Sequence, residues 1–86
     1  MHAQVITVDF TDAETAMKGL DELIPNVKAS PGFVAGYWVR TDDSHGTSIA
    51  VYDTAEHAAA TAPPVGAEMD GVKVTGSQIG QVMGSA

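Results

Sequence analysis

The spacing of apolar residues changes several times along the chain, and each change indicates a new element of secondary structure. Alternating apolar residues in QVITVDF, residues 4–10, predict a strand. Apolar residues recur at spacings of three and four in TDAETAMKGLDELIPNV, residues 11–27, and predict an amphipathic helix. This helix is expected to begin at Thr11, with Glu14 in capping-box spacing, and to end at Pro25.

The rest of the chain shows two further strands, a short helix and a last strand. GFVAGYWVRTDDSHGTSIAVYDT, residues 32–54, is typical of an antiparallel hairpin with a polar turn around TDDSHG. DTAEHAAATA, residues 53–62, predicts a helix with Asp53 and Glu56 in capping-box spacing, stopped by the two prolines that follow. VKVTGSQIGQVM, residues 72–83, has strand character, and its glycines indicate a bulge or a close backbone approach.

The resulting order is β-α-β-β-α-β within a single domain, residues 1–86. It predicts the α+β, ferredoxin-like plan, in which two helices cover one face of a four-stranded antiparallel sheet. The other face is then left without a cover from the same chain.

Both faces of the predicted hairpin are apolar. With Thr41 opposite Thr47, Trp38 lies opposite Ala50. One face carries Val34, Trp38, Ala50 and Tyr52. The other carries Phe33, Ala35, Tyr37, Val39, Ile49 and Val51. An apolar patch of this extent is unusual on a monomer. We therefore expect a homodimer in which the sheet face away from the helices packs on the same face of its copy across a two-fold axis.

Composition narrows the classes of partner. Four Lys and Arg residues against eleven Asp and Glu residues give a formal charge of -7, which disfavours nucleic acids and anionic membrane surfaces. The chain has no cysteine, which excludes disulfides, thiolate nucleophiles and cysteine zinc sites, and no histidine pair has zinc-site spacing. With no signal peptide or membrane-spanning segment in view, we expect a cytoplasmic protein without a metal.

Three stretches resemble a known family: PGF before the hairpin, VYDTAEHAAA where a strand runs into a helix, and GVKVTGSQIGQV near the C-terminus. They are similar to the dimeric α/β-barrel superfamily, and within it to the antibiotic-biosynthesis-monooxygenase-like domains. The resemblance covers nearly the whole chain. It implies a homodimeric barrel with a cavity between helices and sheet for a small, often aromatic, ligand. The Asn, Trp and His triad of the haem-degrading members has no counterpart here, so no haem is expected.

Two functions remain open at this point. The resemblance implies a small monooxygenase-like domain that oxidises an aromatic or polyketide-like compound without any cofactor. The alternative is a non-catalytic, ligand-binding or stress-related homodimer, which the scarcity of convergent polar residues favours. Whether the protein is an enzyme is left open.

Two aromatic residues are candidates for the site. Trp38 and Tyr52 share one face of the hairpin and serve either as ligand-binding rings or as core and dimer-interface packing. In the resemblance, Tyr52 and Asp53 stand where many of these domains have Trp followed by an acidic residue. We expect Trp38 to pack the barrel, and Tyr52, next to the second helix, to be the better pocket residue and a candidate for catalysis.

The remaining candidates are polar. Arg40, the single arginine, either orients an anionic or phenolic ligand or forms ion pairs with Asp42 and Asp43. His57, in the first turn of the second helix, is either a general base or a solvated surface residue. His45, in the hairpin turn, has no neighbours that the sequence can name.

Overall fold

A computed structural model describes all 86 residues of the chain. Its elements, in order, are β1 (His2–Phe10), α1 (Ala13–Lys28), β2 (Phe33–Arg40), β3 (His45–Tyr52), α2 (Ala55–Ala60), β4 (Glu68–Met69) and β5 (Val72–Gln81). The predicted order of strands and helices is confirmed, and the short strand β4 is added within the loop that follows α2. Neither helix has the length and hydropathy needed to cross a membrane.

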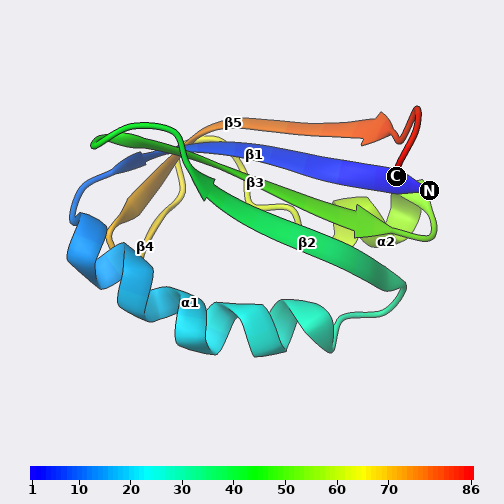
Figure 1. The fold of residues 1–86 in the computed structure, drawn as a ribbon, viewed down its shortest axis with the longest axis horizontal. Coiled ribbons are helices and arrows are strands. Elements are labelled where there is room, and N and C mark those ends of the chain that lie inside the picture. The colour runs from blue at the N-terminus through cyan, green and yellow to red at the C-terminus, as the bar shows by residue number, and fades with distance from the viewer.

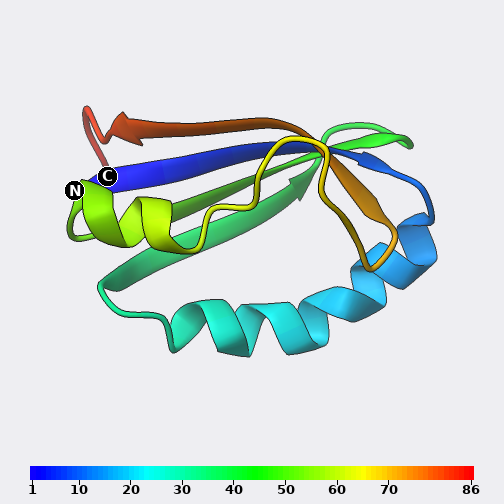
Figure 2. The ribbon, with the colours of Figure 1, turned by 180° about the vertical axis from the view of Figure 1, so that it is seen from behind.

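The strands form one curled antiparallel sheet in the order β2-β3-β1-β5-β4. Both helices lie on the same side of this sheet, and no helix covers the opposite side (Figure 1). Seen from behind, the chain after α2 runs along the sheet to β4, near the start of α1 (Figure 2). This is a ferredoxin-like α+β arrangement with five strands rather than the predicted four, because Glu68 and Met69 pair with the start of β5.

The predicted register of the hairpin is wrong by two residues. Thr47 lies opposite Val39 rather than Thr41, and Trp38 lies opposite Ser48. The turn is centred one residue earlier than predicted, on Asp43, and within it the Asp42 carboxylate accepts hydrogen bonds from Ser44 N and His45 Nδ1, each at 2.8 Å. A shift of two residues keeps every side chain on its predicted face, since side chains alternate with a period of two.

Phe33 and Val34 lie on the opposite faces from those predicted. The ladder between β2 and β3 shifts between Phe33 and Ala35, so Phe33 pairs with Tyr52 and points to the helices. An irregularity of one residue reverses the alternation before it. The two rings meet edge to face, with centroids 5.8 Å apart, while Val34 is half-exposed.

The helices begin one residue later than predicted. Asp12, not Thr11, caps α1 by accepting a hydrogen bond from Thr15 N, and Gly71 O accepts from both Thr11 N and Asp12 N. That attachment to the β4–β5 turn fixes where the helix can start. In the same way Thr54, rather than Asp53, caps α2.

Pro25 does not end α1, which continues to Lys28. A proline lacks the N–H that would bond to the carbonyl four residues earlier, but it still offers a carbonyl of its own. Ala29 N donates to Pro25 O at 3.1 Å, so the last turn is closed despite the proline.

The packed core lies at the α2 end of the sheet. Tyr52 and Ala58 are fully buried there, with Ala50 beside them, and Phe33 packs against this group. The small side chains of α2 permit this close approach. The longer α1 has no buried residue at all, although its sequence is amphipathic. The domain is therefore well packed under α2 and poorly packed under α1.

Tyr52 also connects the ends of the two helices. Its hydroxyl lies 3.1 Å from Ser30 Oγ, just after α1, and 3.0 Å from Thr61 Oγ1, just after α2. The Ser30 hydroxyl in turn donates to Val27 O. One buried hydroxyl thus joins both helix termini to the sheet.

We predict that Tyr52→Phe lowers the free energy of unfolding by about 1–3 kcal/mol, because it removes the hydrogen bonds that join the tyrosine hydroxyl to Ser30 and Thr61. Urea denaturation followed by circular dichroism measures this change. The control is Ser85→Ala, which removes an exposed hydroxyl near the C-terminus, and its effect should stay within about 0.5 kcal/mol. Equal effects of the two substitutions would contradict the role given to Tyr52.

Candidate functional site

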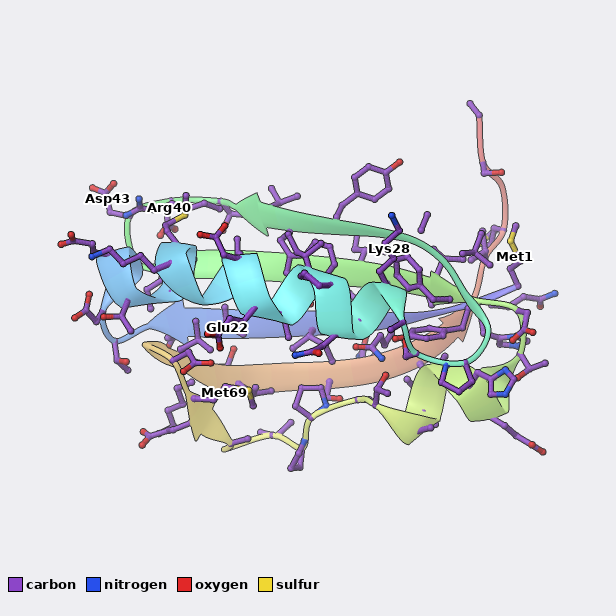
Figure 3. All side chains as sticks on the ribbon, turned by 90° about the horizontal axis from the view of Figure 1, so that it is seen from below. Met1, Glu22, Lys28, Arg40, Asp43 and Met69 are labelled. Atoms are coloured by element: carbon purple, nitrogen blue, oxygen red, sulfur yellow. The ribbon has the colours of Figure 1, made fainter.

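A single cavity of about 380 Å³ lies between α1 and the sheet. Strands β1, β2 and β3 contribute to its floor and α1 to its roof, and α1 runs lengthwise over the sheet (Figure 3). Most of the surface lining it is apolar. Its size falls within the range of known small-molecule sites, which starts at roughly 300 Å³.

Small side chains on β3 leave this space open. The sheet face toward the helices is here called the inner face. On β3, which lies between β2 and β1, this face carries Gly46, Ser48 and Ala50. The residues that pair with them on β1 are larger: Val8, Ile6 and Gln4. The short side chains of Ser48 and Ala50 leave room between β3 and α1, while the Phe10 ring covers Gly46.

The roof side of α1 is also open in its first half. Ala16 and Gly19 face the cavity there, and Leu20, Leu23 and Val27 follow along the helix. Leu23 keeps 40% of its surface exposed, so even the large residues of this stripe are not enclosed. A ligand in the cavity would bury them.

Trp38 forms the aromatic wall of the cavity. It lies on the inner face, opposite Ser48, and its ring extends over Gly36. A Cβ atom at Gly36 would stand 2.9 Å from Trp38 Cη2, so the ring needs a glycine beneath it. Trp38 is therefore a cavity residue, whereas we expected it to be packing.

Tyr52 is not among the residues that line the cavity, although we expected it to be the better pocket residue. Its ring is fully buried between β3 and α2, and its hydroxyl is bonded to the two partners described above. The strand end where Tyr52 sits is covered by the alanines of α2. Trp38 thus lines the cavity, and Tyr52 lies in the packed core under α2.

Gln4 is a buried polar residue on the cavity wall that the sequence interpretation missed. It is 7% exposed, and its Nε2 donates to Ala58 O and Thr61 Oγ1, each at 3.0 Å. The Ala58 carbonyl accepts only, which fixes the orientation of the amide. The remaining acceptor, Oε1, is left for the cavity. A signal was present in the sequence, because Gln4 is in phase with Ile6 and Val8 on an otherwise apolar face.

Arg40 lines the cavity at the hairpin end, on the flank of α1 next to β2 (Figure 3). It does not pair with the carboxylates of Asp42 and Asp43. Instead its Nε donates to Asp42 O at 3.2 Å and its Nη2 to Asp43 O at 3.0 Å. The guanidinium carbon lies 5.5 Å from the centre of the Phe10 ring, which also lines the cavity.

His57 lies outside the cavity, at the start of α2. Its Nδ1 donates to Asp53 Oδ1 at 2.6 Å, and this bond holds the pKa of the Asp53 carboxyl below its usual range. Gly32 passes beside the pair with a φ of 77°, and a Cβ atom there would collide with both side chains. His57 and Tyr52, the two candidates for catalysis, therefore do not meet in one open site.

His45 bridges two carboxylates on the outside of the hairpin. Its Nδ1 lies 2.8 Å from Asp42 Oδ1 and its Nε2 lies 3.3 Å from Asp9 Oδ1. The hydrogen bond to Asp42 and the negative charge beside it raise the pKa of His45 above its ordinary value. The sequence named no neighbours for this residue, because Asp9 comes from the adjacent strand β1. No group of three or more acidic or histidine side chains is placed to hold a metal ion.

No family model, no curated protein and no solved structure matches the chain. The resemblance to the monooxygenase-like domains therefore rests on the sequence motifs alone. The cavity, its polar groups and its charges carry the functional argument.

We predict that His45 stabilises the fold more at acidic than at alkaline pH. Because its pKa is raised in the folded chain, its contribution is full below the unfolded pKa of about 6.5 and is lost as the pH rises through the folded value. The urea midpoint of the parent should therefore exceed that of His45→Gln by more at pH ~5 than at pH ~8.5. In the Asp42→Asn background, which lacks the main partner of His45, the effect of His45→Gln on the urea midpoint should differ less between the two pH values. A gap between parent and His45→Gln that is independent of pH would contradict this assignment.

Proposed function

We propose that this protein binds a small, largely apolar organic compound in the cavity between α1 and the sheet. The observation that carries the proposal is a cavity of about 380 Å³ in a domain of only 86 residues. The cavity leaves apolar side chains of α1 in contact with water, which costs free energy. A ligand that fills the cavity buries these side chains.

The lining is suited to a ring system with a few polar substituents. Trp38 and Phe10 offer aromatic surfaces, and the leucines of α1 offer aliphatic ones. Polar groups are few and well placed, as is usual for small-molecule sites: the Gln4 carbonyl, the Ser48 hydroxyl and the Arg40 guanidinium. The aromatic walls support the aromatic ligand that the resemblance implies.

The position of the ionisable groups favours binding over catalysis. A general base has to lie within hydrogen-bond reach of the proton that it removes. The charged residues of the lining are Arg40 and Asp70, and no histidine is among them. Oxidation of the bound compound by a monooxygenase-like, cofactor-independent reaction stays a prediction, which oxygen uptake in the presence of a bound phenol would test.

We predict that phenylnaphthylamine, an uncharged fluorescent probe, binds in the cavity. Trp38 is the single tryptophan, so energy transfer from tryptophan to the probe reports on this site. Ser48→Leu should fill the floor and weaken binding by about tenfold or more while the fold is kept. The control is Ser85→Leu, which makes the same change at an exposed position outside the cavity. Binding that is unchanged by Ser48→Leu would place the probe elsewhere.

A second copy of the chain is the partner that we propose for the sheet face away from the helices, here called the outer face. Its middle is apolar: Val5, Tyr37 and Ile49 lie side by side on three strands. Tyr37 is 64% exposed and Ile49 is 37% exposed. The charged residues of this face lie at one end: Asp9, His45, Glu68 and Lys73. A two-fold axis through the apolar middle would keep like charges apart and give the dimeric barrel.

We predict a particle of twice the chain mass of 8.9 kDa in light scattering at micromolar concentration. Ile49→Asp should yield a folded monomer, because it places a charge at the centre of the proposed interface. Val65→Asp is the control, since Val65 is exposed in the loop after α2. A folded monomer for the parent chain would exclude the dimer, and a dimer that survives Ile49→Asp would place the interface at another surface, such as the free edge of β2.

A further inference from the structure

We infer that the ligand is an amphipathic organic acid, with its apolar part in the cavity and its anionic group at Arg40. The inference rests on the proposed function, because it assigns the chemistry of the same site. Arg40 is the cation among the lining residues, and Lys18, Lys28 and Lys73 all lie outside the cavity.

The charge of Arg40 is not neutralised by the protein. The chain has eleven carboxylate side chains and four Lys and Arg residues, yet no carboxylate lies within ion-pair distance of this guanidinium. The nearest acidic residue in sequence, Asp42, uses its carboxylate for Ser44 N and His45. Hydrogen bonds from these two groups also hold the pKa of Asp42 below its usual range, so the carboxylate stays ionised and engaged with the turn.

The guanidinium is held in place with donors to spare. Two backbone carbonyls, Asp42 O and Asp43 O, accept from Nε and Nη2. A guanidinium has five N–H groups, so three remain for a ligand, including both on Nη1. The Phe10 ring lies 5.5 Å from the guanidinium carbon and also covers Gly46, the residue opposite Arg40. Such a positioned fork suits a carboxylate, sulfonate or phosphate group.

The location of Arg40 assigns the two ends of the ligand. Arg40 is exposed, whereas Ile6, Ala50 and Gln4 on the same inner face are buried. An anion at Arg40 therefore keeps part of its hydration, while the attached rings or chain lie deeper, beside Trp38 and Ser48. A doubly charged or wholly polar compound would gain nothing from the apolar lining.

Asp70 makes this orientation specific. It is the other charged residue of the lining and belongs to the turn between β4 and β5, where its Cβ would lie 3.2 Å from a Cβ at Gly19. This turn is on the opposite flank of α1 from Arg40, as the positions of Met69 and Arg40 show (Figure 3). An anionic group is thus attracted on one flank of the helix and repelled on the other.

The test compares two probes that share one ring system: anilinonaphthalene sulfonate and uncharged phenylnaphthylamine. Their dissociation constants are measured by energy transfer from Trp38, and the ratio of the sulfonate value to the neutral value is the readout. Arg40→Gln should raise this ratio by about tenfold or more, because a charge-assisted hydrogen bond is lost for one probe only. Arg40→Lys, which keeps the charge without the planar fork, should give an intermediate ratio.

Lys28→Gln is the matched control, since it removes one positive charge at the far end of α1 and should leave the ratio unchanged (Figure 3). A ratio that Arg40→Gln and Lys28→Gln change equally would overturn the assignment of Arg40, while binding of phenylnaphthylamine would still support the cavity as a site. Failure of both probes to bind the parent protein would overturn the proposed function itself.

Discussion

Helix α1 lies over a sheet face on which β3 offers only small side chains. Gly46, Ser48 and Ala50 supply the inner face of this strand, and α1 itself has no buried residue. Its two ends are nevertheless fixed. In the β4–β5 turn, Gly71 O accepts hydrogen bonds from the amides of Thr11 and Asp12. At the other end, the Tyr52 hydroxyl is hydrogen-bonded to Ser30. The cavity, the exposure of the apolar side of α1 and the position of Trp38 all depend on this combination of fixed ends and an unfilled middle.

The remainder of the inner face is arranged around Tyr52. Its ring contacts Phe33 and its hydroxyl reaches Thr61, which also accepts from Gln4. A continuous set of hydrogen bonds therefore runs from the end of α1, through the buried tyrosine, to the amide on the cavity wall. The end of the cavity near α2 is polar, and the end near the hairpin carries the charge of Arg40. Such an arrangement distinguishes the two ends of a bound molecule.

Much of the fold was predictable from sequence, because each change in apolar period marks a real element and the order of elements leaves few topologies. The errors arose where one local contact overrides the pattern. The hydrogen bonds of Asp42 belong to a hairpin turn centred one residue earlier than predicted, and an irregularity after Phe33 reverses its face. The cavity was expected only through the resemblance. A cavity depends on how two elements pack together, and the residue pattern of one element does not show this. Small residues at alternate positions of GTSIA indicated it, and Gln4 in phase with apolar neighbours indicated its polar wall.

The unfilled middle beneath α1 links the stability of the domain to the supply of its ligand. A compound that binds the folded chain and not the unfolded one adds to the free energy of unfolding by mass action, about 2.7 kcal/mol at a hundred times its dissociation constant. Domains of this size have only a modest free energy of unfolding, so such an addition is a large fraction of the total. The folded fraction, and with it the resistance to proteolysis, would then follow the concentration of the ligand.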